Sequence, residues 1–448
     1  MSDILISIAA VAVVLGFMIL IHEFGHYAVA KLLGVRVEQF AIGFGKRLIG
    51  FRKGDTDYRI NILPLGGYVK MSGENPMDER TGDPGEFMSH SRWHRFLIAI
   101  AGPSMNILLA IVLLTTVYMV HYEYPVFRDQ PAVIAGVKHD SPAAQAGLRL
   151  GDRIVKVDGI DNPTWEQLQP RVMLSANQPL TVTIQRGDQT FQKTIVPQAV
   201  TSNEVGSAGW FPEEPVIVDQ IEDGTPAAKA GMKEGDRIIA LDGQPLLSIE
   251  SMIDQLQQTK EKPVDLTVNR GGQTLNFQMS PVYAKTEDPK EKRYRLGFLN
   301  KSEMRVTTLP FGQAFALSLE QNKKYSLLIL ELAKKIVQGK VSPRMVSGPI
   351  GIAQDAGYAA KQKGWTPLME LTAGISLNLG IFNLLPIPIL DGGVILFLFI
   401  EGLMRRDVSL RIKERVYQAA FVFLVLFAVM VIYNDLMKTL PGLMDRLP

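Results

Sequence analysis

Residues 4–26, ILISIAAVAVVLGFMILIHEFGH, begin as an unbroken apolar run and end in two histidines four positions apart. The run up to Ile21 carries no charge and is long enough to cross the hydrocarbon core of a bilayer as a helix. Side chains at this spacing project from one face of a helix and can share a metal ion. The sequence therefore predicts a transmembrane helix over residues 1–33 that carries a metal-binding pair.

His22, Glu23 and His26 match the motif H-E-x-x-H, in which the histidines bind zinc and the glutamate is the general base of a hydrolase. Two histidines that only pack in a helix are the alternative, because the His-x-x-x-His spacing alone is a weak signal. A cleaved signal peptide would also explain the apolar run, but Asp3 stands where a basic start is expected and no small-residue cleavage site follows. The glutamate and the intramembrane position favour a zinc site with Glu23 as the catalytic residue.

The composition fits a membrane protein that also has polar domains. The chain has 448 residues, room for about three units, and combines 47% hydrophobic with 21% charged residues. Its formal net charge of +2 gives no reason to expect a nucleic-acid partner. There are no cysteines, so disulfides and thiolate metal sites are excluded, and a metal ion must be held by His, Asp or Glu.

Three further apolar stretches predict transmembrane helices at residues 96–122, 371–403 and 416–437. Basic residues gather after the first helix, in residues 34–95, and again in the loop 404–415. The positive-inside rule assigns both regions to the cytoplasm. Both chain ends, including the tail 438–448, are then expected on the outer side, and His22 and Glu23 toward the cytoplasmic end of their helix.

Two regions between the spans are less regular. Short strands and turns are expected within residues 34–95, with a polar loop at 74–90. The strands form either a small cytoplasmic β-hairpin domain or a sheet beside the active site whose edge pairs with an extended substrate. Residues 284–370 predict a linker and amphipathic helices that lie on the membrane surface.

An internal repeat occupies the region between the second and third spans. SPAAQAGLRLGDRIVKVDG at 141–159 recurs as TPAAKAGMKEGDRIIALDG at 225–243, too close a match for chance. The pattern resembles permuted bacterial PDZ domains and predicts two α/β domains, at 126–200 and 211–283. PDZ domains accept peptides at a groove, and the residues expected to line the two grooves are Ala135, Gly136, Val137, Val216, Ile217 and Val218. Alternatively, the copies are spacers that bind no peptide.

Asp391 is the only acid between Thr372 and Ile400 of the third span. Counted inward from Thr372, it lies at about the depth that His22 reaches when counted from Ile4. An ionisable residue in a membrane is costly enough to suggest a function. His22, His26 and Asp391 would supply three ligands and leave one position for water, as in catalytic zinc sites. The alternative is an Asp-Gly turn that ends a helix at the interface.

Asn106, Asn378 and Asn383 also lie in predicted spans. Asn106, in the second span, is expected to bond a neighbouring helix rather than to act in catalysis. Asn378 and Asn383, in the third, either bond neighbouring helices or hold a substrate backbone open near the metal ion.

Together these features resemble the site-2 protease family of intramembrane zinc metalloproteases. The matching elements are HEFGH in the first span, Gly102-Pro103-x-x-Asn106 in the second, the PDZ tandem, and NLLPIPILDGG at 383–393. The resemblance covers nearly the whole chain. It implies a polytopic α-helical membrane protein with four transmembrane helices, a membrane-reentrant β-hairpin at about 43–71 and two inserted α/β PDZ domains in tandem.

For the site, the resemblance implies one catalytic Zn²⁺ held by the residues that match His22, His26 and Asp391, with Glu23 as the catalytic acid and base. It also implies substrate contacts by Asn378, Asn383 and an edge strand made of Gly67, Tyr68, Val69, Lys70 and Met71.

The resemblance further implies a function and a location. The family cuts single-span membrane proteins after a first protease has removed their outer domain, so the expected partners are an anti-sigma factor, signal-peptide remnants and the lipid bilayer. The PDZ tandem would act as a size filter. The expected protein is a monomer of the bacterial inner membrane, with both termini and the PDZ domains periplasmic and the active site toward the cytoplasmic leaflet.

Two other classes of protein remain open. A non-enzymatic scaffold with a degenerate metal site would contain no zinc. A transporter that uses intramembrane His and Asp residues would show inverted repeats among its spans, and the four predicted spans display no such symmetry.

Overall fold

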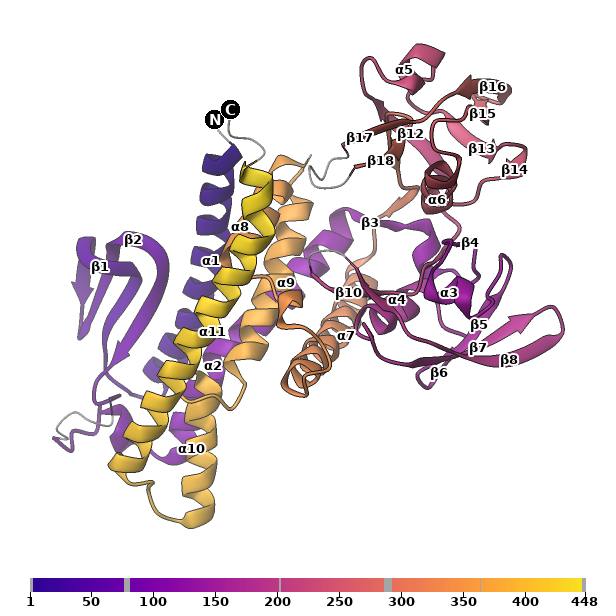
Figure 1. Ribbon diagram of the computed structural model, residues 1–448. Coiled ribbons are helices and arrows are strands. Elements are labelled where there is room, and N and C mark those ends of the chain that lie inside the picture. The colour runs from indigo at the N-terminus through magenta and orange to yellow at the C-terminus, as the bar shows by residue number, and fades with distance from the viewer. Residues whose placement is uncertain (1–2, 76–80, 201–202, 286–291, 363, 445–448) are drawn as a thin grey trace. The chain divides into compact units, whose positions relative to one another are not determined.

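The computed structural model describes residues 3–75, 81–200, 203–285, 292–362 and 364–444, and the chain divides into two units (Figure 1). The first unit consists of Met1–Tyr122, Thr308–Glu331 and Ser347–Asp435, and the second of Glu123–Thr307, Leu332–Val346 and Leu436–Pro448. Parts of the predicted loop (76–80), linker (286–291) and tail (445–448) lie outside the described residues.

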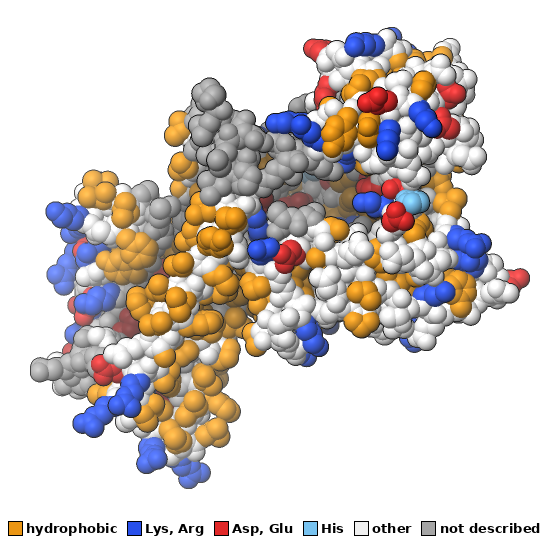
Figure 2. Space-filling view, viewed as in Figure 1, with side chains coloured by type: hydrophobic (Ala, Val, Ile, Leu, Met, Phe, Trp, Pro, Cys, Tyr) orange, Lys and Arg blue, Asp and Glu red, His pale blue; other side chains and the backbone are white. Residues whose placement is uncertain are grey.

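Long apolar helices dominate the first unit. Among the described helices, three are long and apolar enough to cross a membrane: Leu5–Leu32 within α1 (Asp3–Leu32), α2 (Arg92–Val120), and Leu410–Lys438 within α11 (Leu410–Met444). Ser91 starts α2 by accepting a hydrogen bond from the His94 N–H. Hydrophobic side chains cover the visible face of α11, whereas Lys and Arg gather where α10 and α11 meet (Figure 2).

The predicted third span, 371–403, is two helices, α9 (Thr366–Asn383) and α10 (Asp391–Met404). Pro386 and Pro388 lack the N–H that a continuing helix needs, so the chain forms an irregular loop between the two helices. α9 packs on α2 through a buried apolar cluster that includes Ala110, Leu114 and Leu377. Because neither helix reaches the length and hydropathy of the other three, the count of four spans stays a prediction.

Where the sequence predicted several short strands, the structure has two long strands, β1 (Val37–Lys53) and β2 (Thr56–Met71). Gln39 pairs with both Asp57 and Lys70, so the first half of β1 lies between the two halves of β2. The end of β2 therefore forms an edge of this sheet among the described strands. The hairpin exposes several large apolar side chains, namely Phe44, Leu48, Ile49, Phe51, Ile60 and Ile62.

Each copy of the repeat in the second unit builds a small sheet covered by short helices. The first copy comprises β4 (Gly136–Val137), α3 (Pro142–Gln145), β5 (Arg153–Val157), β6 (Ile160–Asp161), α4 (Trp165–Met173), β7 (Leu180–Arg186), β8 (Gln189–Ile195) and β11 (Trp210–Phe211). The second comprises β12 (Val216–Ile221), α5 (Pro226–Ala230), β13 (Arg237–Leu241), β14 (Gln244–Pro245), α6 (Ile249–Thr259), β15 (Val264–Arg270), β16 (Gln273–Met279) and β19 (Phe298–Lys301).

The remaining elements are short strands and turns of the second unit and two helices. They are η1 (Phe87–Ser89), β3 (Tyr122–Pro125), η2 (Val126–Asp129), β9 (Gln198–Val200), β10 (Val205–Ser207), β17 (Val282–Lys285), β18 (Lys292–Arg295), β20 (Met304–Thr307), α7 (Phe311–Val337), η3 (Pro343–Met345) and α8 (Pro349–Lys361). β3 pairs with β20, so the chain runs into and out of the repeat through adjacent strands. Asp435 of α11 accepts hydrogen bonds from three backbone N–H groups at the start of α8, the first from Gly348.

The same ion pair stabilises both copies of the repeat. Arg186 donates to the fully buried Asp152 at 2.6 Å, and Arg270 donates to the fully buried Asp236 at 2.7 Å. Burial opposes ionisation of these carboxyls, but the arginine hydrogen bond, a backbone N–H and the nearby positive charges together outweigh it and hold the pKa of both below the ordinary value. The repeated sequence thus builds the same buried contact twice.

Both copies extend beyond their predicted ends at 200 and 283. Trp210 is buried in the core of the first copy, and β11 pairs with β4. Leu296 is buried in the core of the second copy, and β19 pairs with β12. In each copy a strand from the far end of the segment pairs with the first strand, as a separate two-stranded sheet in the first copy and within the main sheet in the second, which the local pattern did not indicate.

In the second copy the predicted groove residues do not lie at an open sheet edge, and the groove assigned to the first copy stays a prediction. Val216, Ile217 and Val218 lie on β12, an inner strand that pairs with β13 on one edge and β19 on the other. Ala135, Gly136 and Val137 lie at β4, which is bonded to β11, while the adjacent backbone of Ile134 bonds Asp152. A peptide cannot add to a strand whose two edges are already paired.

Candidate metal centre

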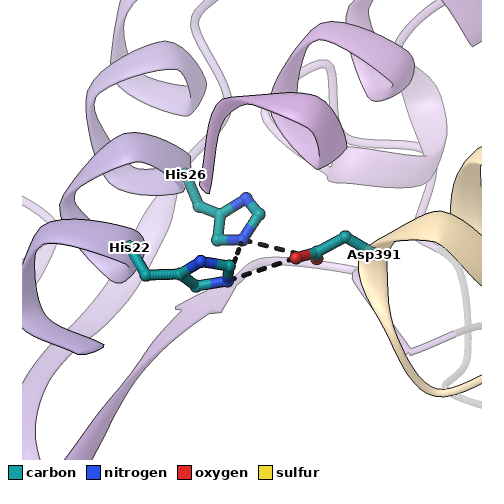
Figure 3. A group of neighbouring side chains, drawn as sticks. All are labelled: His22, His26 and Asp391. Carbon is teal, nitrogen blue, oxygen red and sulfur yellow. Dashed lines mark hydrogen bonds and ion pairs between the residues drawn. The ribbon is translucent and has the colours of Figure 1, made fainter. Parts of the chain in front are cut away.

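The three predicted ligands meet at one point of the first unit. His22 and His26 extend from α1 and Asp391 from the start of α10, and the three side chains point toward one another (Figure 3). The two Nε2 atoms are 3.2 Å apart. His22 Nε2 is 3.2 Å from Asp391 Oδ2, and His26 Nε2 is 3.4 Å from Asp391 Oδ1. Two nitrogens and a carboxylate thus surround a common centre.

These separations suit zinc. Ligand bonds of about 2.0–2.2 Å around tetrahedral zinc put neighbouring ligand atoms roughly 3.3 Å apart, which is the spacing of these three groups. Both histidines are buried. Among the described residues, these three side chains form the group of His, Asp and Glu residues whose ligand atoms lie close enough together to share one metal ion. Three protein ligands leave one tetrahedral position open, as catalytic zinc sites require.

Contacts from α2 orient both histidines. The His26 Nδ1–H donates to the backbone carbonyl of Ile98 at 2.7 Å, so the Nε2 of the neutral ring is free to bind a metal. The carboxamide of Asn106 lies 3.2 Å from His22 Nδ1. The sequence predicted that Asn106 would bond a neighbouring helix, and missed that its partner is a metal-ligand candidate. A buried asparagine in a span was the available signal.

Glycines let α1 and α2 approach closely beside the histidines. A Cβ on Gly102 would lie 2.3 Å from His26 Nε2, and a Cβ on Gly25 would lie 2.5 Å from the Ala101 carbonyl oxygen. Both distances are far inside van der Waals contact. The glycine of the Gly102-Pro103 motif therefore provides the space that the His26 ring occupies.

Gly102→Ala is expected to displace the His26 ring and to lower both the zinc content and the cleavage rate, the rate by about a hundredfold, in line with loss of metal-ligand orientation. Zinc per chain and the initial rate of cleavage check this. Gly374→Ala is the matched control, because a Cβ there meets nothing within 4 Å. Full zinc loading in Gly102→Ala would show that His26 does not need this space.

The start of α10 directs Asp391 toward α1. A Cβ on Gly392 would lie 2.2 Å from the Leu385 carbonyl oxygen, so the helix can begin close against the preceding loop only with glycine there. In that loop Ile389 has a φ of +87°, a strained conformation for a β-branched residue. Pro386 and Pro388 end the helical hydrogen bonding before Asp391, which begins a new helix after the break.

Glu23 lies between the two histidines in sequence but contacts β2. Its carboxylate accepts a hydrogen bond from the Val69 N–H at 2.9 Å. Glu74, which the sequence did not indicate because it lies in a polar loop, accepts one from the Met71 N–H at 3.2 Å. Burial raises the pKa of Glu74 above its ordinary value. The predicted edge strand thus lies directly beside the predicted catalytic glutamate.

A cavity of about 950 Å³ connects these groups. Its lining includes His22, Glu23, Asp391, Val69 and Asn383 at one end and Glu401, Lys413 and Tyr417 between α10 and α11 at the other. The Asn383 carboxamide is 3.4 Å from His22 Nε2. Asn378, by contrast, bonds the Gly374 carbonyl of its own helix and is not among the described lining residues.

Comparison with known proteins gives a consistent set of relatives. The family model described as peptidase family M50 matches residues 10–427. The regulator of sigma-E protease RseP of Salmonella typhimurium is 34% identical over 461 residues, covering 97% of this chain and 99% of the relative. Its Escherichia coli counterpart is 32% identical over 465 residues, with coverage of 97% and 99%. A Vibrio cholerae protein named as a zinc metalloprotease is 32% identical, with the same coverage.

Among solved structures, the PDZ domain of the SdrC-like protein from Listeria monocytogenes matches 19% of this chain and 85% of its own, at 21% identity. The TM-score is 0.17, which does not establish a shared fold.

Proposed function

Since this chain belongs to peptidase family M50, we propose that His22, His26 and Asp391 hold its zinc and that Glu23 moves the proton during peptide hydrolysis. The protein is a zinc metalloendopeptidase that crosses the inner membrane several times and acts in sigma-E regulation. One observation carries the assignment. Three candidate ligand side chains, whose polar atoms approach one another to 3.2–3.4 Å, meet beside Glu23, which lies on a helix apolar enough to lie in the bilayer.

When bound, zinc supplies a Lewis acid that polarises the scissile carbonyl and lowers the pKa of a coordinated water toward about 7. Glu23 lies on the same helix as the two histidines and lines the same cavity, and the Val69 N–H fixes its carboxylate by donating to it at 2.9 Å. It accepts the proton of the attacking water and returns a proton to the leaving amine. His26 keeps its Nε2 toward the ion because its Nδ1–H is bonded to Ile98.

The substrate docks as an extended strand on the edge formed by Gly67, Tyr68, Val69, Lys70 and Met71. A helical peptide bond is shielded by its own hydrogen bonds, so pairing with an edge strand exposes it for attack. The Val69 contact with Glu23 puts this edge next to the base. Asn383 lies in the cavity 3.4 Å from His22 Nε2 and contacts the unwound backbone, whereas Asn378 is engaged within α9.

The substrates are single-span membrane proteins whose outer domain has already been removed, an anti-sigma factor and signal-peptide remnants among them. Four spans put both termini and the repeats in the periplasm, with the basic loops and the site toward the cytoplasm. The exposed apolar side chains of the hairpin, such as Leu48, Ile49 and Phe51, suit contact with lipid. The enzyme acts as a monomer.

Removal of the metal tests the enzymatic proposal. Purified protein in liposomes should cleave a single-span model substrate, lose cleavage after treatment with 1,10-phenanthroline, and recover it when stoichiometric zinc is added. Initial rates and zinc per chain are measured in the same samples. Cleavage at the full rate by metal-depleted protein would contradict the proposal, and a scaffold would neither contain zinc nor cleave.

The two repeats form a PDZ tandem that excludes substrates whose outer domain is intact. Their position supports an insertion that can be removed as one piece, because the Val126 N–H bonds the Glu303 carbonyl at 3.0 Å and the two ends lie side by side. A chain lacking residues 126–303, joined by a short glycine linker, should cleave uncut substrate and still cleave precut substrate. If uncut substrate stays intact while precut substrate is cleaved, the filter lies elsewhere.

A further inference from the structure

Asn106 lies where three helices of the first unit meet. It is fully buried in α2, and its carboxamide faces His22 Nδ1 of α1 at 3.2 Å. Its backbone carbonyl accepts a hydrogen bond from the Ser376 hydroxyl of α9 at 2.8 Å. The side chain is therefore directed at a candidate metal ligand, while the hydrogen bond with α9 goes to the backbone.

We propose that Asn106 is a positioning residue that sets the tautomer of His22 and thereby the affinity of the site for zinc. The inference rests on the proposed ligand set. In the metal-loaded enzyme the Asn106 Oδ1 accepts the His22 Nδ1–H, which leaves the Nε2 lone pair for the ion. Asn106 does not touch substrate or water in this role.

His22 needs such an acceptor because a neutral imidazole carries its one proton on either Nδ1 or Nε2. Such a ring carries one N–H, and a nitrogen that binds a metal cannot carry it. The Nδ1–H of His26 has the Ile98 carbonyl as acceptor. The Nδ1–H of His22 needs an equivalent acceptor, because a buried N–H without one would favour the other tautomer, in which the proton is on Nε2.

The Asn106 side chain can supply that acceptor. Its nitrogen faces His22 here, and its Oδ1 is buried with no hydrogen-bond partner among the described residues. The oxygen and nitrogen of a carboxamide are nearly equal in size, so half a turn of the amide exchanges them without repacking. After this rotation of the carboxamide, the Asn106 Oδ1, which has no partner among the described residues before it, accepts a hydrogen bond from the His22 Nδ1–H.

Substitutions can separate this role from simple helix packing. The bond from Ser376 goes to the Asn106 backbone and survives any side-chain change at 106. Asn106→Leu keeps approximate size but removes the acceptor, Asn106→Asp keeps an acceptor oxygen, and Ser376→Ala removes the packing bond alone. A residue that only joins helices would change the thermal midpoint of the metal-free protein in all three variants and leave the zinc affinity unchanged.

The experiment is a chelator competition that measures the zinc Kd of each purified full-length variant. Asn106→Leu should bind zinc about 10- to 100-fold more weakly than wild type, whereas Asn106→Asp and Ser376→Ala should stay within about threefold of it. Asn106→Ala serves the same purpose if Asn106→Leu does not fold. Equal Kd values for wild type and the Leu or Ala variant, or an Asp variant as weak as Leu, would overturn the proposal.

The variant His22→Phe separates a failure of the proposed ligand set from a failure of the proposed role of Asn106. It should abolish zinc binding if the proposed ligand set is right. If wild type binds no zinc, or His22→Phe binds it as wild type does, the ligand set fails. If His22→Phe loses zinc and Asn106→Leu does not, only the role of Asn106 fails.

Discussion

Glu23→Gln is expected to reduce peptide-bond cleavage by about a thousandfold while the protein keeps its zinc. General acid–base groups contribute factors of about 10²–10⁴, and a carboxamide cannot take up the proton of the attacking water. The Gln side chain has nearly the same shape, and its Oε1 can still accept the Val69 N–H. Since the change leaves His22, His26 and Asp391 untouched, the fold and the metal site should remain.

Initial rates on a single-span substrate, with zinc per chain from the same preparation, check this expectation. Glu320→Gln makes the same chemical change on the exposed surface of α7 and should cleave at the wild-type rate. A Glu23→Gln protein that keeps more than a tenth of the wild-type rate would remove Glu23 from the proton transfer. Loss of zinc in this variant would instead make Glu23 a ligand.

Asp391→Ala is expected to empty the metal site and to reduce cleavage to background. Two imidazoles on one helix would remain, without the charge and the third ligand atom that complete the site. Asp391→Asn should behave similarly even though it preserves the size of the side chain, because a neutral amide is a poor zinc ligand. The loss of zinc would therefore result from the missing carboxylate and not from the cavity that alanine leaves.

Elemental analysis of purified protein measures the effect. Asp407→Asn is the control, because Asp407 lies just beyond the C-terminal end of α10, away from the end that Asp391 begins, is half-exposed and pairs with Arg92 at 2.9 Å. That variant should keep its zinc and its activity. Stoichiometric zinc in Asp391→Ala would mean that another residue completes the site.

Local patterns in the sequence predicted the parts of the site that depend on one helix. The apolar run and the spacing of His22 and His26 need no distant contact, and α1 carries both. Asp391 was found by counting depth along the apolar run of the third span, and Pro386 and Pro388 in that run account for the break between α9 and α10. Its role as a ligand stays a prediction, and the lone acid in an apolar stretch that suggested it is a signal that does not depend on helix continuity.

Features that depend on long-range pairing were harder to predict. The groove residues of the second copy were assigned to an inner strand because nothing near β12 in the sequence indicates that β19 pairs with it. The role of Asn106 depends on how closely α2 packs on α1, which Gly25 and Gly102 allow but do not specify. The folding of β1 between the two halves of β2 likewise depends on the whole sheet.

The most direct test of the central claim is the X-ray absorption spectrum of zinc in the purified wild type and in Glu23→Gln. The account predicts one zinc per chain in both proteins, bound by nitrogen and oxygen at about 2.0–2.2 Å with the scattering of two imidazoles, and superimposable spectra. A different imidazole number in wild type, or a coordination shell that changes in Glu23→Gln, would contradict the assignment of His22, His26 and Asp391 as ligands and of Glu23 as the free base.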